Sequence, residues 1–139
     1  FSDTEIEAII RLEIEKYKIR FEGSSEGFIN NWPASYNISG WLVSMQSGGK
    51  LDSHMHDAGW ISGSVYINVP PKVRPDSGNL VVCSSDDKHV TSVEERQENS
   101  VDVVTGTLCL FPSSLHHYTV PFEDAENRIV LAFDVIPRK

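Results

Sequence analysis

The alternation of apolar and polar residues constrains this chain most. From about residue 21 onward, short runs, of which the first two alternate with a period of two, are rich in β-branched and aromatic residues. They include residues 41–46, 61–69, 79–83, 101–104, 107–111 and 128–135. Side chains on a β-strand alternate between its two faces, so such runs predict strands with one buried face. Gly, Pro, Asp and Asn separate the runs, as expected for turns.

A single helix is predicted before the strands, over residues 2–20. Ser2 and Glu5 have the spacing of a capping box, in which each side chain bonds a free backbone N–H of the first turn. An apolar stripe follows at helical spacing, formed by Ile6, Ile10, Ile14 and Tyr17. One helix followed by many short strands indicates a mainly β protein with a closed or sandwiched antiparallel architecture, not βαβ units. We expect the helix to pack outside the barrel.

Length and charge restrict the class of protein. The 139 residues fit one domain, and the net charge of −8 argues against nucleic-acid binding, because 12 basic residues are outnumbered by 20 acidic ones. No run approaches the roughly 18 apolar residues of a membrane span. The start of the chain has neither the basic nor the apolar region of a signal peptide. Cys83 and Cys109 lie in apolar runs and are predicted to be buried free thiols in a reducing compartment, which points to a cytoplasmic location.

Two segments are predicted to be loops. Pro70 to Gly78 contains three prolines, and Ser84 to Ser100 is long, charged and poor in apolar residues. A loop of that length is often a lid or a partner surface, although it can also be simply mobile.

The histidines form the most informative chemical pattern. His54 and His56 are two residues apart, so on a regular strand they point to the same side, while Asp57 points to the other. A second pair, His116 and His117, lies about 60 residues later, and only one of these neighbours can face the same cavity. Three imidazoles on one ion leave coordination positions open, which is the layout of a catalytic metal site. The alternative is that these histidines are ordinary polar residues.

The spacing around the histidines resembles the two signature segments of the cupin superfamily. Gly48 precedes His54 in a Gly-x5-His-x-His pattern. Gly106, Pro112 and His117 follow one another at the intervals of the second signature segment. The glutamate expected a few residues after His56 is absent, because Trp60 and Ile61 stand there. The resemblance implies a double-stranded β-helix, or jelly-roll, barrel.

A closer resemblance covers about residues 37–137. Three blocks carry it in order: His54 to Tyr66 (HMHDAGWISGSVY), Leu110 to Phe122 (LFPSSLHHYTVPF) and Arg128 to Pro137 (RIVLAFDVIP). They resemble the 2-oxoglutarate-Fe(II) oxygenase family of the type found alone or C-terminal to tetratricopeptide repeats. The resemblance implies one domain over residues 1–139, with an N-terminal helix within residues 1–20 and a barrel over about 37–137. It also implies Fe(II) and 2-oxoglutarate as cofactors.

The resemblance assigns roles to individual residues. His54, His56 and His117 would bind the iron, with Asp57 as a less favoured alternative ligand. The usual triad is two histidines and one carboxylate, and His56 stands where that carboxylate is expected. Arg128 would grip the far carboxylate of 2-oxoglutarate, because a guanidinium donates two parallel N–H bonds. Further donors to the cofactor are expected among Tyr66, Ser62 and Thr119.

The predicted enzyme would hydroxylate a small molecule or a peptide side chain and release succinate and CO2. Two alternatives stay open at this point. One is a cupin-type metalloprotein that does not use 2-oxoglutarate, for which Arg128 is dispensable. The other is a non-catalytic barrel that binds a ligand or a partner.

Overall fold

The computed structural model describes residues 3–48, 56, 58–83, 98–123 and 127–138. Within them lie two helices, α1 (Asp3–Arg20) and α2 (Gly27–Asn30). The strands are β1 (Tyr36–Met45), β2 (Ile61–Asn68), β3 (Leu80–Cys83), β4 (Glu98–Val101), β5 (Leu108–Pro112), β6 (His116–Thr119) and β7 (Arg128–Pro137). The protein is mainly β, as the alternating runs predict.

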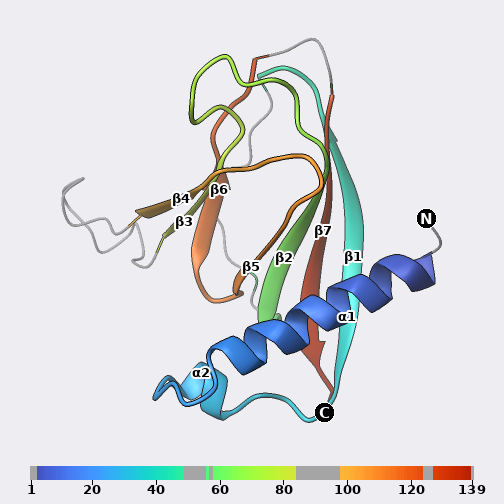
Figure 1. The fold of residues 1–139 in the computed structure, drawn as a ribbon, viewed down its shortest axis with the longest axis vertical. Helices are drawn as coiled ribbons and strands as arrows, with labels where there is room; N and C mark the ends of the chain where they lie inside the picture. Colours follow the sequence, from blue (N-terminus) through green and yellow to red (C-terminus); the bar gives the residue numbers. More distant parts are fainter. Residues whose placement is uncertain (1–2, 49–55, 57, 84–97, 124–126, 139) are drawn as a thin grey trace.

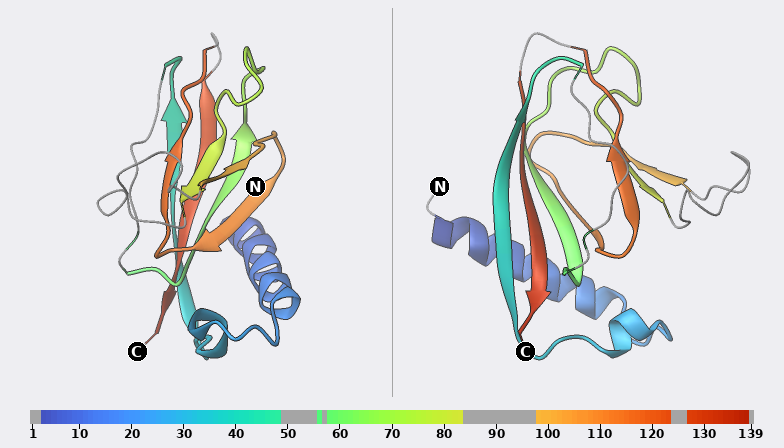
Figure 2. Two further views of the ribbon diagram at one scale, coloured as in Figure 1. Left: turned by 90° about the vertical axis from the view of Figure 1, so that its left-hand side faces the viewer. Right: turned by 180° about the vertical axis from the view of Figure 1, so that it is seen from behind.

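The strands form two antiparallel sheets. The larger sheet has the order β1-β7-β2-β5, and the smaller one has the order β4-β3-β6. The long strands β1 and β7 pair along their whole length, from Tyr36 with Pro137 to Met45 with Arg128. Figures 1 and 2 show the smaller sheet on one side of the larger one, in the arrangement of a double-stranded β-helix. The predicted fold class is therefore confirmed.

The helix α1 covers the outer face of the larger sheet, as the views in Figures 1 and 2 agree. Ile10 and Ile14, from the predicted apolar stripe, are buried against Ile61, Phe133 and Val135 of the sheet. Burial of aliphatic and aromatic side chains here supplies a hydrophobic layer of the usual kind. The expectation of one helix packed outside the barrel is thus confirmed.

A second hydrophobic cluster lies between the two sheets. Its buried members come from both sheets and from the segment after β4: Tyr66, Leu80, Val82, Val103, Phe111 and Val130. Tyr66 and Val130 are direct cross-strand neighbours on β2 and β7. Successive residues of β7 therefore serve two different cores, one under α1 and one inside the barrel.

Several elements differ from the prediction, and β1 begins at Tyr36 rather than near residue 41. The run predicted at residues 101–104 forms a strand at 98–101, and most of the predicted loop Ser84 to Ser100 lies outside the described residues. β6 was not predicted from hydrophobicity, because its sequence, HHYT, is largely polar and contains no apolar run. The short helix α2 was also missed. The loop at Pro70 to Gly78 is confirmed.

Both cysteines are free thiols, as predicted, with Cys83 buried and Cys109 partly buried. Burial raises the pKa of the Cys109 thiol to about 11, so this thiol is protonated at neutral pH. Among the residues that the structure describes, no helix has the length and apolar character needed to cross a membrane.

Candidate active site

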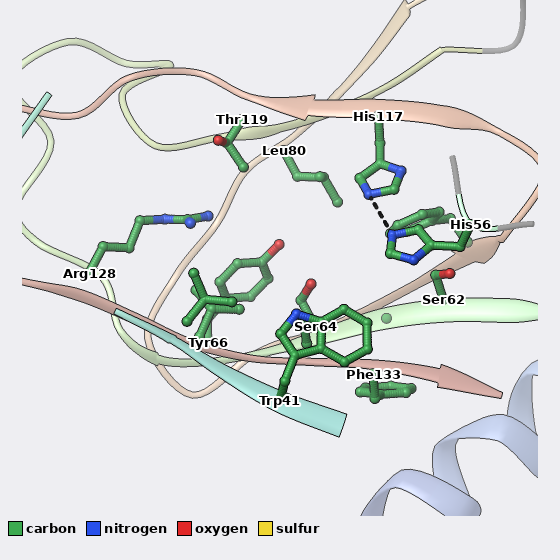
Figure 3. A pocket seen from close by; sticks show the side chains of 15 residues that line it. Trp41, His56, Ser62, Ser64, Tyr66, Leu80, His117, Thr119, Arg128 and Phe133 are labelled. Atoms are coloured by element: carbon green, nitrogen blue, oxygen red, sulfur yellow. Dashed lines mark hydrogen bonds between the residues drawn. The ribbon is translucent and has the colours of Figure 1, made fainter. Parts of the chain in front are cut away.

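A cavity of about 170 Å³ lies between the two sheets (Figure 3). This is smaller than the roughly 300–1,000 Å³ of pockets for drug-sized ligands, so it suits a small molecule. Its lining is mainly apolar, with polar groups concentrated at two ends. Six of the predicted site residues line it: His56, Ser62, Tyr66, His117, Thr119 and Arg128. His54 and Asp57 lie outside the described residues.

One end of the cavity holds two histidines that are distant in sequence. The Nε2 atoms of His56 and His117 are 3.3 Å apart, and their rings are stacked with an interplanar angle of 9°. His117 lies on β6, whereas His56 lies outside the described strands. The expectation of a regular strand at His56 was therefore wrong, although the His56 side chain lines the cavity. Its backbone N–H donates to the Ser113 carbonyl, 3.1 Å away, and this bond holds His56 next to the residue that follows β5.

The other nitrogens of the two rings face acceptors. His56 Nδ1 is 3.0 Å from the Asp134 carboxylate, and His117 Nδ1 is 3.4 Å from the Leu115 carbonyl oxygen. A carboxylate or a carbonyl can only accept, so in the neutral rings both protons belong on Nδ1. Both Nε2 atoms then direct lone pairs toward each other. A proton or a metal cation between them relieves this repulsion.

The pair of nitrogens fits a shared metal ion. Metal–imidazole bonds are about 2.1 Å long, as for zinc, so two nitrogens on one ion lie at most about 4.2 Å apart. The separation of 3.3 Å is within that limit. No third histidine, cysteine or carboxylate completes a group of three metal donors among the described residues. The third predicted ligand, His54, is not among those residues.

Asp134 belongs to this end of the cavity and was missed in the sequence. Its second carboxylate oxygen accepts a hydrogen bond from the Ser62 hydroxyl at 2.6 Å, and Ser62 also contacts the Ser113 hydroxyl at 2.8 Å. Asp134 and Ser62 are cross-strand neighbours on β7 and β2. A usable signal was present, because Asp134 is a lone acidic residue within the apolar run from Ile129 to Ile136, on the same strand face as Arg128.

The opposite end of the cavity is occupied by Arg128 (Figure 3). The side chain is 3% exposed and donates one hydrogen bond, from Nη2 to the Gly78 carbonyl at 3.2 Å. Its Nε has no hydrogen-bond partner among the described residues. Burial lowers the pKa of this guanidinium, which nevertheless stays protonated. A buried cation with no carboxylate partner among the residues that the structure describes is costly, so its presence indicates a site for an anion.

Tyr66 and Thr119 lie between the two ends. The Arg128 guanidinium is 5.5 Å from the centre of the Tyr66 ring, within the range of a cation–π contact. Burial raises the pKa of Tyr66 to about 12, so its hydroxyl is a neutral donor at physiological pH. Ser62 lies instead at the histidine end, where its hydroxyl contacts Asp134 and Ser113.

The two tryptophans near the predicted pocket have different positions. Trp41 is 40% exposed at the cavity, with its ring centre 5.9 Å from that of His56. Trp60 packs against the hydrophobic cluster between α1 and the larger sheet, where it stacks on Phe28 with ring centres 5.4 Å apart. Only Trp41 is therefore placed to contact a molecule that enters beside His56.

Comparison with known proteins gives an independent line of evidence. A family model described as "Putative 2OG-Fe(II) oxygenase" matches residues 39–134. A Pseudomonas putida prolyl-4-hydroxylase is similar in structure, with a TM-score of 0.56 and 20% identity over 74% of this chain and 53% of that one. A Burkholderia pseudomallei oxidoreductase of the 2OG-Fe(II) oxygenase family gives a TM-score of 0.55 and 17% identity, over 81% of this chain and 49% of that one.

The chain thus spans about half the length of these two structures. At such identities the structural likeness establishes the fold alone. No curated protein matches the chain by sequence.

Proposed function

The chain belongs to this 2OG-Fe(II) oxygenase family, and from that premise we propose that it is an Fe(II)- and 2-oxoglutarate-dependent hydroxylase. In the proposed reaction a substrate C–H bond becomes C–OH, while 2-oxoglutarate and O2 are converted to succinate and CO2. The bound iron and 2-oxoglutarate supply this oxidative chemistry, and the protein supplies position and electrostatics.

The histidine end of the cavity is the proposed iron site. His56 and His117 direct their Nε2 atoms to a common point, and His54 is proposed as the third ligand. Imidazole is a suitable ligand for iron, and three protein ligands leave room for a cosubstrate. Asp57 stays a less favoured alternative ligand.

Arg128 is the observation that carries the proposal for 2-oxoglutarate. It has the only full charge among the described cavity-lining residues, it is buried, and it lies at the end opposite the histidines. A ligand that fits has one end for a metal and a free carboxylate at the other, as 2-oxoglutarate does. The neutral hydroxyls of Tyr66 and Thr119 are proposed as further donors between the two ends. For Ser62 this role stays a prediction, since its observed contacts are with Asp134 and Ser113.

The substrate is proposed to enter beside Trp41, whose exposed ring borders the histidine end. A small molecule and a peptide side chain both fit this description. Nucleic acid does not, because the net charge of −8 opposes a phosphate backbone.

An anaerobic titration tests the proposal. Fe(II) and 2-oxoglutarate added together to the wild-type protein should give the visible absorption band of an iron–oxoglutarate chelate. Arg128→Ala should abolish the band while iron still binds, because the carboxylate loses its guanidinium partner. His117→Ala should prevent the binding of iron itself.

Two residues that do not line the cavity supply matched controls. His116→Ala should leave iron binding intact, because His116 is next to His117 on β6 but does not line the cavity. Arg20→Ala, at the end of α1, should leave the chelate band intact. Bound iron without the band would favour a metalloprotein that does not use 2-oxoglutarate. A wild-type protein that binds no divalent metal would favour the non-catalytic barrel.

A further inference from the structure

We infer that Asp134 is a positioning residue for the metal site, which acts through His56. It would hold the His56 ring in the tautomer that binds metal. It would also place a negative charge next to this ligand, which a set of three neutral histidines lacks. The inference rests on the proposed function, since it takes His56 to be a ligand. The family resemblance assigned no role to Asp134.

The Asp134 carboxylate contacts the nitrogen of His56 that faces away from His117. Asp134 Oδ2 lies 3.0 Å from His56 Nδ1, while His56 Nε2 points to His117. The carboxylate accepts a hydrogen bond from Nδ1–H and so disfavours the tautomer with its proton on Nε2. That disfavoured tautomer would place a hydrogen where a metal has to bind. Asp134 therefore prepares Nε2 as a lone-pair donor before any metal arrives.

The carboxylate is itself held in place. Ser62 donates to its other oxygen at 2.6 Å, and Ser62 contacts the fully buried Ser113. The Ser113 carbonyl accepts from the His56 backbone N–H, so the same residue supports both partners. Gly59 passes so close that an added Cβ would lie 2.4 Å from the Ser113 hydroxyl and 3.5 Å from the Asp134 carboxyl carbon. The position admits no larger residue without moving this network.

The common non-haem iron triad has two histidines and one carboxylate, and His56 stands where the carboxylate is expected. Three neutral ligands would leave the ion with one anionic bond fewer. A carboxylate on Nδ1 makes the imidazole a more basic ligand, and such partners typically change metal affinity by about 10–100-fold. Asp134 would restore, through the ring of His56, part of the charge that the direct ligands lack.

A purely structural ion pair explains the same residues less well. The Asp134 side chain is only 14% exposed, and it lies between Phe133 and Val135, which serve the hydrophobic core. A carboxylate at such a position costs stability unless it is well paired. Ser62 and His56 provide that pairing, and His56 also faces the cavity.

Two measurements on Asp134→Leu test the inference. Long-range proton–nitrogen NMR spectra of the metal-free protein, with nitrogen-15 in its histidines, report the tautomer of each ring, and His56→Gln assigns the signals. We expect Nδ1–H for His56 in the wild type and a mixed or Nε2–H form in the variant. Titration with Co(II), followed by its visible absorption, should show affinity about 10–100-fold lower in the variant.

Asp102→Leu is the matched control, because it removes the same charge from an exposed carboxylate. It should change neither the tautomer nor the Co(II) affinity. If Asp134→Leu fails to fold, Ser62→Ala is the second variant. It keeps the carboxylate but removes its support, and it should weaken Co(II) binding a few-fold.

The inference would be overturned if His56 kept the Nδ1–H tautomer in Asp134→Leu, or if Co(II) affinity were unchanged. Loss of Co(II) binding with an unchanged tautomer would make Asp134 a direct ligand and would equally contradict it. Failure of the wild-type protein to bind Co(II) would instead contradict the proposed function. The tautomer of the metal-free protein still decides separately whether Asp134 orients His56.

Discussion

The two faces of the larger sheet are built from the same strands, but one face stabilises the fold and the other forms the candidate site. On the outer face, Phe133 and Val135 of β7 pack under α1 with aliphatic and aromatic neighbours. On the inner face, Arg128 and Asp134 of that same strand present charged groups toward the cavity or its histidines. The period of two in a strand thus lets ten residues carry a stabilising layer and a chemical site together.

Burial on the two faces should contribute to the free energy of unfolding with opposite signs. Burial of apolar area on the outer face stabilises the fold. Burial of Arg128 on the inner face has a cost, because a desolvated cation with few partners gains little in return. If this comparison is correct, substitutions under α1 should change stability, and substitutions of the charged cavity residues should change binding. Substitutions on each face distinguish these two contributions.

Ile14→Ala should have the largest effect on stability. Ile14 has 0% exposure beneath α1, and loss of a buried isoleucine side chain costs about 2–5 kcal/mol. Ile9→Ala is the matched control on the same helix, where Ile9 is 50% exposed, and it should cost less than about 0.5 kcal/mol. Urea denaturation followed by circular dichroism measures both. Equal losses for the two variants would mean that α1 does not pack as described.

Tyr66→Phe should reduce the loss of stability that occurs at alkaline pH. Burial raises the pKa of Tyr66 from 10.0 to about 12, so above pH 10 the unfolded chain loses this proton before the folded one does. Stability should therefore be constant in this respect below pH 10 and fall as the pH rises from 10 toward 12. The loss should be about 2–3 kcal/mol, since one pKa unit corresponds to about 1.4 kcal/mol.

The measurement compares the free energy of unfolding of both proteins at several pH values from 9 to 12. The decline in the phenylalanine variant should be smaller by that amount. Part of the decline should remain, because burial also raises the pKa values of Cys109, Tyr17 and Tyr36. Parallel curves for the two proteins would show that the Tyr66 hydroxyl is not desolvated.

Arg128→Met should change stability by no more than about 1 kcal/mol, because replacement of a buried charge by an apolar chain of similar length is often neutral or stabilising. The same variant should lose binding of 2-oxoglutarate. Thermal denaturation and the anaerobic chelate titration together check the two expectations. A loss of stability as large as that of Ile14→Ala would erase the contrast between the faces.

The surface pair of Glu7 and Arg11 should have the smallest effect. Their side chains form an i, i+4 ion pair at 2.8 Å and are 50% and 39% exposed. Glu7→Ala should cost only about 0.3–0.5 kcal/mol, and less in 1 M salt, because exposed pairs are screened. Denaturation at low and high salt measures the difference. A loss that salt does not reduce would show that Glu7 contributes by packing.

Much of the fold could be predicted because its signals are local. Alternation of apolar and polar residues marks β2, a nearly continuous apolar run marks β7, and the spacing of Ile10 and Ile14 marks the buried side of α1. β6 could not be predicted in this way, because its pairing with β3 depends on partners such as Val82 rather than on its own polar sequence. The short helix α2 was missed as well, and its four residues carry no buried side chain.

For the site, the residue types could be identified from the amino-acid sequence: two histidine pairs and an arginine at the head of an apolar strand. Tertiary structure alone decided that His56 meets His117 across 61 residues and that Asp134 meets Ser62 across 72. It also decided that Arg128 is buried, with no hydrogen-bond partner for its Nε in the described part of the chain, rather than reaching solvent from a strand edge. The reason is physical, because local propensity sets the period of a strand, whereas sheet register and crossovers set which distant side chains share a cavity.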